Sequence, residues 1–409
     1  MRKERFFGWS VAWAAFVVAV FAWGIGFYGP SVFLQTLHDT RGWSITQIST
    51  AISAHYLMSA VVIAYLPEIH RKFGVSITTF VGALFTALGL AAWSGAWQPW
   101  HLFAAAVPSA VGWAMTSGAA LNAIVSKWFD RDRPKAMGLA FNGASVGGII
   151  FIPLWVYLIG RFGFQTAALA VAGTTVVTIG FLSAKYLRAS PDSLGVSLDG
   201  GISKQSTSRS MPSLSRLEIL RTPKFITMSA AFSLGLFAQI GMVAHLIVRL
   251  TSEVGVTGAG MLVSLATVSA VAGRTLLGWW IGDRDRRLAL ALNFMVQITG
   301  VLFLMFGGAW PTLALGCVLF GLGMGNLTSL SPLIAQAEFD RKDVMTVVAL
   351  IIGINQAVFA FAPAIVGALR DATSDYVLPF AVLACVQLLS AIIILLGRDA
   401  VRPPAIEGS

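Results

Sequence analysis

The chain has 409 residues, of which 56% are hydrophobic and only 11% are charged. Soluble domains carry roughly 25% charged residues, so this composition and a mean hydropathy of +0.78 exclude a soluble globular protein and indicate a polytopic membrane protein. The net charge of +10 does not indicate nucleic-acid binding, because the basic residues fall in short clusters between apolar runs.

Apolar runs of the roughly 17–25 residues needed to span a bilayer predict twelve transmembrane helices. They lie at about 9–37, 44–66, 76–97, 101–126, 135–159, 165–187, 224–249, 257–281, 288–307, 311–336, 343–369 and 376–397. The first run is much longer than the roughly 7–15 apolar residues of a signal peptide, so we expect a retained helix. The sequence therefore predicts an all-α integral membrane protein.

The polar, serine-rich segment 188–223 divides the predicted helices into a bundle at 1–187 and a bundle at 224–397, with a tail at 398–409. Within this linker, the stretch SLSRLEILR predicts a short helix lying in the membrane interface. Most of the 28 lysines and arginines fall in the tails and in loops on the side of the N-terminus. Since positive loops stay inside, both termini and the linker are expected to be cytoplasmic.

An internal repeat supports this division into halves. At an offset of about 210 residues, Phe129-Asp130-Arg131 returns as Phe339-Asp340-Arg341, and Pro153 returns as Pro363. Transporters are commonly built from repeated halves.

Twelve helices in two repeated halves, with a basic loop after the second helix and its echo after the eighth, resemble the major facilitator superfamily. The segment KWFDRDRPKAMGLA at 127–140, continuing to Pro153, is similar to the signature of its monocarboxylate and oxalate–formate porter branch. Gly273-Arg274-x-x-x-Gly278 and Asp283-Arg284 resemble that branch's eighth-helix pattern, whose arginine meets the substrate carboxylate. The resemblance implies a substrate site between the two halves, near mid-membrane.

Two positions depart from that family's pattern. The loop after the second helix normally carries an aspartate before its arginine, but the segment 67–74, PEIHRKFG, has His70 or Arg71 there. We therefore place the gating loops at Arg71, Asp283 and Arg284 and expect the usual ion pair of the first half to be absent or rebuilt. Many monocarboxylate porters carry an aspartate one turn before the arginine, and this chain has Ala270, which argues against their usual proton coupling.

Arg274 is the candidate for binding an anionic substrate. All 18 acidic residues fall in loops, helix ends or tails of the predicted topology, whereas transporters of cations generally need an intramembrane carboxylate. A charge inside a spanning helix costs roughly 2.5–3.5 kcal/mol on insertion scales and commonly marks a solute pathway. The planar guanidinium suits bidentate recognition of a carboxylate. The alternative is that Arg274 snorkels to the interface or bonds backbone carbonyls of neighbouring helices.

His55, midway along the second predicted helix, is the candidate proton carrier or substrate donor, because histidine titrates near neutral pH. The alternative is a neutral histidine bonded to a helix neighbour. The remaining candidate substrate-binding residues are polar side chains of the predicted cavity wall: Tyr28, Ser117, Asn326 and Asn355.

Each of these four residues is a candidate for a separate reason. Tyr28 lies between glycines and a proline that would open the first helix locally. Ser117 and Asn326 occupy nearly equivalent points of the two repeats. Oxalate porters of the family carry a second cation where this chain has Asn355, which favours a substrate with one carboxylate. Asn293 and Gln297 are discounted, because the resemblance implies that the ninth helix is peripheral in the fold.

The sequence thus predicts a secondary transporter of a small organic anion, with a monocarboxylate as the favoured substrate, working by exchange, facilitated diffusion or proton symport. The alternative is an exporter of drugs or other amphiphiles on the same fold. No nucleophile–base pair or metal cluster indicates an enzyme, and no cofactor or metal is expected. The expected setting is a monomer in the cell's inner (plasma) membrane, with a small carboxylate, protons and the lipid bilayer as partners.

Overall fold

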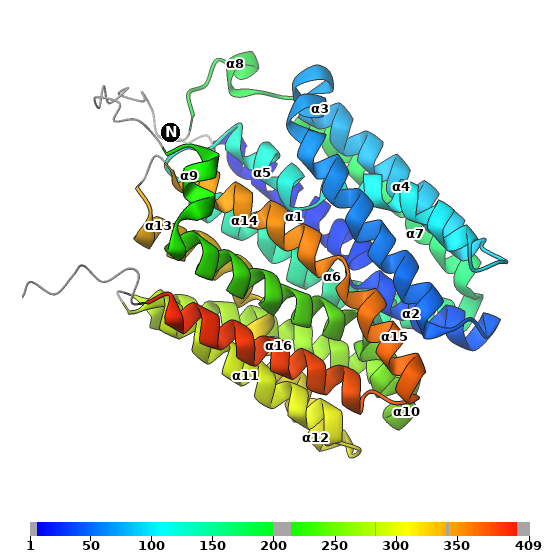
Figure 1. Ribbon diagram of the computed structural model, residues 1–409. Coiled ribbons are helices and arrows are strands. Elements are labelled where there is room, and N and C mark those ends of the chain that lie inside the picture. The colour runs from blue at the N-terminus through cyan, green and yellow to red at the C-terminus, as the bar shows by residue number, and fades with distance from the viewer. Residues whose placement is uncertain (1–5, 199–213, 283, 341–342, 399–409) are drawn as a thin grey trace, which may run out of the picture. The chain divides into compact units, whose positions relative to one another are not determined.

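The computed structural model describes residues 6–198, 214–282, 284–340 and 343–398. These residues form helices joined by short connections, and no strand occurs among them (Figure 1). The prediction of an all-α protein is confirmed. The helices up to the linker are α1 (Phe7–Gly26), α2 (Gly29–Arg41), α3 (Ile45–Ser94), α4 (His101–Thr116), α5 (Gly118–Ser126), α6 (Arg133–Phe162), α7 (Phe164–Leu182), a π-helical turn (Ser183–Leu187) and α8 (Pro191–Leu194).

The linker helix and the later helices follow the same pattern. They are α9 (Arg216–Arg221), α10 (Pro223–Ile281), α11 (Arg286–Phe306), α12 (Trp310–Met324), α13 (Asn326–Glu338), α14 (Val344–Phe359), α15 (Ala362–Thr373) and α16 (Val377–Leu396).

Ten helical stretches of the described chain are long and apolar enough to cross a membrane. Two of them, α3 with 50 residues and α10 with 59, are far longer than one crossing requires. At 1.5 Å per residue, 50 residues extend about 75 Å, more than twice the roughly 30 Å of a bilayer core. Each contains one glycine with a positive φ, Gly74 at 77° and Gly255 at 70°, where the helical backbone is interrupted. Two crossings in each would agree with the predicted twelve.

Four predicted spans are broken at a single point. The first breaks at Phe27 and Tyr28, the fourth at Ser117, the tenth at Gly325 and the eleventh at Ala360 and Phe361. The break at Tyr28 confirms that the glycines and proline around it open the first helix. The breaks at Ser117 and Gly325 lie at nearly equivalent places of the two repeats. The first break is at the candidate site residue Ser117, and the second is directly before the candidate site residue Asn326.

The chain divides into two compact units. The first contains residues 1–206 and 244–264, and the second contains residues 207–243 and 265–409. In the first unit, α1 lies against α6, and α3 lies against α4 and α7 (Figure 1). Glycines allow these close approaches: a Cβ on Gly89 of α3 would meet Ser109 of α4 at 2.7 Å, and one on Gly143 of α6 would clash with the carbonyl of Phe16 in α1.

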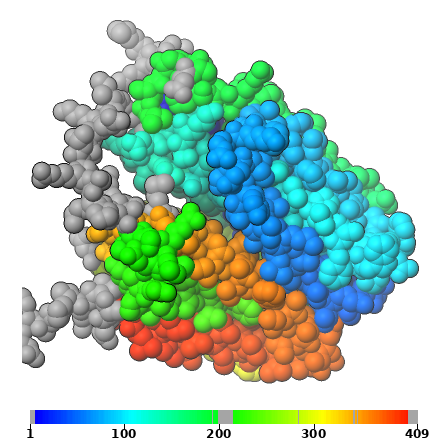
Figure 2. Space-filling view, turned by 45° about the horizontal axis from the view of Figure 1, so that its top comes forward, coloured from blue at the N-terminus to red at the C-terminus, as the bar shows by residue number. Residues whose placement is uncertain are grey.

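Figure 2 shows the surface of α3 and α4 in blue to cyan. This surface carries large apolar side chains. Tyr65, Leu84 and Leu88 of α3 and Phe103 of α4 are all exposed. A soluble protein rarely exposes so many apolar side chains on neighbouring helices, whereas a bilayer solvates them.

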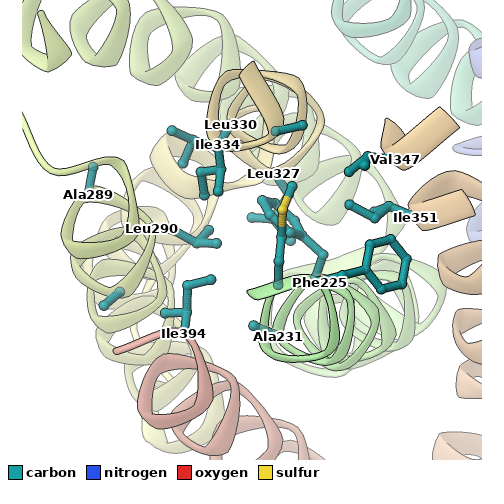
Figure 3. Close-up of a cluster of buried hydrophobic side chains, with 14 of the residues drawn as sticks. Phe225, Ala231, Ala289, Leu290, Leu327, Leu330, Ile334, Val347, Ile351 and Ile394 are labelled. Atoms are coloured by element: carbon teal, nitrogen blue, oxygen red, sulfur yellow. The ribbon is translucent and has the colours of Figure 1, made fainter. Parts of the chain in front are cut away.

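In the second unit, one apolar core joins five helices. Figure 3 shows Phe225 and Ala231 of α10 together with side chains of α11, α13, α14 and α16 that point toward the same centre. The linker helix α9 begins with a capping box of Ser215 and Glu218 and adds Ile219, which is fully buried, to this core. The predicted short linker helix is therefore present and is docked onto this unit.

Candidate functional site

Arg274 lies where α10 meets the break between α12 and α13. Its Nε donates to the carbonyl oxygen of Gly325 at 3.3 Å. Two glycines allow this approach: a Cβ on Gly273 would clash with the backbone oxygen of Leu322 in α12, and a Cβ on Gly325 would lie 2.9 Å from Nη2 of Arg274. The motif Gly273-Arg274 thus puts a guanidinium directly onto an interrupted helix.

This contact is one form of the alternative that the sequence left open, a bond to a neighbouring backbone carbonyl. A guanidinium has five N–H donors, and the bond from Nε engages one of them. The side chain is half-buried, so its charge acts in a medium less polar than bulk water.

Asn326, the residue after the break, is 5% exposed and donates from Nδ2 to Oδ1 of Asn293 at 2.8 Å and to the carbonyl of Leu322 at 3.0 Å. Its own Oδ1 is buried without a hydrogen-bond partner among the described residues. A buried acceptor without a partner carries a desolvation penalty. A hydrogen bond from a donor group on a bound ligand would offset that penalty. The structure therefore brings Arg274 and Asn326 together at one break.

Asn355 of α14 is also buried, and its Oδ1 accepts from the hydroxyl of Ser233 in α10 at 2.8 Å. A second polar chain crosses the same unit, because Gln387 of α16 donates to Gln297 of α11 at 2.7 Å and Gln297 donates to Gln239 of α10 at 3.2 Å.

The sequence interpretation missed Ser233 and Gln387 and undervalued Asn293 and Gln297. Asn293 is the direct partner of a candidate site residue, and Gln297 is completely buried at the centre of a three-residue chain. The available signal was one amide or hydroxyl on each of several helices at a similar depth, which is typical of interhelical hydrogen bonding.

Tyr28, His55 and Ser117 belong to the first unit. Tyr28 is 4% exposed at the α1–α2 break, where its carbonyl accepts from the hydroxyl of Ser31 at 3.0 Å. Ser117 ends α4 and is buried, with its backbone N–H on the carbonyl of Trp113. His55 is 3% exposed, and its Nδ1 lies 2.9 Å from the hydroxyl of Ser109. The partner of His55 is thus a side chain that sequence reasoning did not name.

Two of the three residues expected in the gating loops, Arg71 and Arg284, are described and exposed. Arg284 donates to the backbone carbonyl of Trp280 in the turn before it and lies 5.2 Å from the centre of that indole ring. Asp283 lies outside the described residues.

A buried ion pair at the ends of α11 and α13 is a further finding. Arg287 binds both carboxylate oxygens of Glu338, with Nε–Oε1 at 2.6 Å and Nη2–Oε2 at 2.7 Å. The same guanidinium donates to the hydroxyl of Thr227 and to the carbonyls of Lys224 and Ile394, so it joins four helix ends of the second unit. Sequence reasoning placed Arg287 and Glu338 outside the predicted spans but did not pair them.

The first residue before α11, Asp285, caps that helix. Its Oδ1 accepts from the backbone N–H groups of Arg287 and Leu288, and its Oδ2 accepts from Nε of Arg398 at 2.7 Å. Partial burial raises the pKa of Asp285, but the bond from Leu288, the bonded charge of Arg398 and the bond from Arg287 outweigh it and leave the pKa below its usual value.

The fold and these buried polar groups define a multi-pass helical membrane protein with polar sites inside its bundles, and comparison with known proteins gives its family. The family model of the Major Facilitator Superfamily matches residues 12–308 and 246–409. The chain therefore belongs to the Major Facilitator Superfamily, and it is a membrane transporter, not an enzyme.

Curated relatives place it beside one branch of that family. Monocarboxylate transporter 13 of Bos taurus is 28% identical over 323 residues, which cover 76% of this chain and 71% of the relative. Monocarboxylate transporter 4 of Rattus norvegicus is 23% identical over 406 residues, which cover 96% and 83%. The resemblance to the monocarboxylate branch is confirmed.

Solved structures agree on the fold. A bacterial homologue of the human lysosomal transporter Spinster, in an inward-facing and occupied conformation, aligns with a TM-score of 0.70 at 14% identity, covering 98% of this chain and all of that one. The nucleoside transporter NupG aligns with a TM-score of 0.73 at 10% identity, covering 96% of this chain and 99% of that one.

Proposed function

We propose that this protein is a secondary transporter of small monocarboxylates and that Arg274 binds the substrate carboxylate. The observation that carries the proposal is the guanidinium of Arg274 held at the break between α12 and α13, beside Gly325 and Asn326. The names of the curated relatives support the same substrate class.

The chemistry of this position favours an anion with one carboxylate. An arginine binds a carboxylate in a bidentate, charge-assisted way, and that interaction strengthens where water is partly excluded. The unpartnered Oδ1 of Asn326 would accept from a hydroxyl or a protonated carboxyl of the ligand. Asn355, bonded to Ser233, is neutral, so it adds no second cation for a dicarboxylate.

The proposed transport cycle is alternating access. Exchange or histidine-assisted symport is favoured over the usual proton coupling, because this chain has Ala270 where many monocarboxylate porters carry an aspartate. His55 is the candidate proton carrier, and Tyr28 and Ser117 are candidate substrate contacts. We further propose that the protein is a monomer in the cell's inner (plasma) membrane, with both termini in the cytoplasm.

The test is counterflow into proteoliposomes with a panel of labelled monocarboxylates, dicarboxylates and cations. Wild-type protein is compared with Arg274→Ala, with Arg274→Lys, which keeps the charge but loses the planar fork, and with Arg216→Ala as a control on an exposed arginine of α9. We expect wild-type protein to accumulate monocarboxylates. Arg274→Ala should abolish this accumulation, Arg274→Lys should lower it at least tenfold, and Arg216→Ala should retain it.

Two results would overturn the assignment. Movement of cations in place of anions would favour the exporter of amphiphiles on the same fold. Anion movement that is indifferent to Arg274→Ala would give this arginine a structural role only, as a donor to the Gly325 carbonyl.

A further inference from the structure

A small internal cavity lies inside the first unit, among α1, α2, α3 and α4. Its volume is about 30 Å³, counted as space open to the centres of water-sized molecules. Its wall is largely apolar, with Ile25, Phe33, Ile52 and Leu90 among the lining residues. One water molecule needs roughly 10–15 Å³ on this measure, so the cavity has room for about two.

Two residues that line this cavity each carry a buried ring nitrogen with no hydrogen-bond partner among the described residues. These nitrogens are Nε2 of His55 and Nε1 of Trp113, on rings whose centres lie 6.5 Å apart. The two residues are only 3% and 7% exposed. Buried polar atoms in native proteins are almost always bonded to protein or to ordered water, so each of these atoms requires a partner.

The opposite edge of the His55 ring is fixed by α3 and α4. The hydroxyl of Ser109 donates to the carbonyl of Ala106 at 3.1 Å and accepts from Nε1 of Trp93 at 3.3 Å. A hydroxyl has one hydrogen, and we assign it to the bond with the Ala106 carbonyl. With this assignment Nδ1 of His55, 2.9 Å from the same oxygen, is the donor, and Nε2 is left as an acceptor.

Two residues of the cavity wall therefore carry one unpartnered acceptor, Nε2 of His55, and one unpartnered donor, the indole N–H of Trp113. Water satisfies both, because it donates and accepts. No acidic residue, lysine or arginine lines the cavity in the described chain. The titratable neighbours are Tyr56 on the same helix, with ring centres 5.0 Å apart, and Tyr28 at the α1–α2 break, and phenols are neutral near pH 7.

We propose that this cavity is a hydration site in which one or two water molecules connect the N–H of Trp113 to Nε2 of His55. Ser109 is the positioning residue that holds the tautomer with hydrogen on Nδ1. When a hydronium ion reaches these waters, its proton adds to the lone pair of Nε2, which leaves an imidazolium and neutral water. The site deepens the proposed role of His55 without depending on Arg274 or on the identity of the substrate.

The test uses the full-length protein in lipid bilayers, with ¹⁵N in histidine side chains and indole groups, and records the transfer of magnetisation from water to nitrogen. His55→Gln and Trp113→Phe assign the two signals. The matched control is Trp155, which is fully buried in α6 but donates to the carbonyl of Gly24 at 3.1 Å. We expect transfer from water to Trp113 and His55 and none to Trp155.

The proposal would be overturned if Trp113 received no more magnetisation from water than Trp155, or if the His55 signal showed hydrogen on Nε2. Ser109→Ala tests the positioning step, because Nδ1 loses its acceptor: we expect a mixture of the two tautomers, whereas retention of the single form would remove Ser109 from the mechanism. If that variant does not fold, the wild-type comparison of Trp113 and Trp155 still decides. If monocarboxylate counterflow failed but water still transferred magnetisation to Trp113, the proposed substrate would be rejected and the proposed hydration site would be retained.

Discussion

Arg287 and Glu338 form a two-pronged ion pair between the start of α11 and the end of α13, with side chains only 3% and 7% exposed. Removal of one partner leaves the other charge buried, which costs about 3–5 kcal/mol for pairs of this kind. We expect Glu338→Gln and Arg287→Met each to lower the thermal unfolding midpoint strongly, as measured by fluorescence in detergent.

The double variant Arg287→Met with Glu338→Gln separates the pair from its surroundings. It leaves no unpaired charge, so it should be less destabilised than the sum of the single variants. Asp371→Asn serves as the control, because its pair with Arg370 is 3.4 Å long, about a quarter exposed and worth about 0–1 kcal/mol. If Asp371→Asn lowered the unfolding midpoint as much as Glu338→Gln does, the greater contribution assigned to the buried pair would be contradicted.

The two glycines of the Gly273-Arg274-x-x-x-Gly278 motif should differ sharply. An alanine methyl at Gly273 would clash with the backbone of Leu322, whereas one at Gly278 would meet no atom within 4 Å. Overpacking typically costs about 1–3 kcal/mol, and an open surface position stays within about 0.5 kcal/mol.

We therefore expect Gly273→Ala to lose stability and substrate counterflow together, because α10 and Arg274 move away from the helix break. Gly278→Ala should retain both properties. Unfolding midpoints and counterflow rates of the two variants in parallel provide the check, and a harmless Gly273→Ala would show that the motif does not position Arg274.

Gln297 is the centre of the polar chain from Gln239 to Gln387, so Gln297→Leu removes both of its bonds at once. Buried groups left without partners cost about 1–3 kcal/mol, although interhelical bonds in membranes are often worth only about 0.6 kcal/mol. We expect a lower unfolding midpoint for Gln297→Leu and a smaller additional loss when Gln387→Leu is added. Fully additive losses would show that the two residues do not interact.

Much of the fold could be predicted from the sequence because a bilayer permits few solutions. Apolar runs, a serine-rich linker and repeated motifs were enough for an all-α transporter fold, and GIGFYGPSVF was enough for the opening at Tyr28. The stretch SLSRLEILR likewise predicted the linker helix, and the structure shows that Ser215 and Glu218 cap it.

The partners of the site residues could not be predicted, because they depend on which helix faces cross. His55 and Ser109 are 54 residues apart, and Asn326 and Asn293 are 33 apart, so no local spacing connects them. General expectations about peripheral helices even led away from Asn293. No sequence pattern connected Gly325 with Arg274, although the lack of a side chain at Gly325 admits the guanidinium.

Asp285 should make stability depend on pH. Its pKa in the folded protein lies below the unfolded value of about 3.9, so its contribution is complete above that value and is lost as pH falls through the folded pKa. Since the pair with Arg398 is more than a third exposed on the aspartate side, screening keeps the ion-pair share below about 1 kcal/mol.

We expect Asp285→Asn, which still caps α11, to lower the unfolding midpoint slightly at neutral pH and to flatten its decline in acid. Asp285→Ala also removes the cap, at about 1 kcal/mol more. Melting curves from neutral to acid pH compare the three proteins, and an unchanged acid decline in Asp285→Asn would assign that decline to other carboxylates.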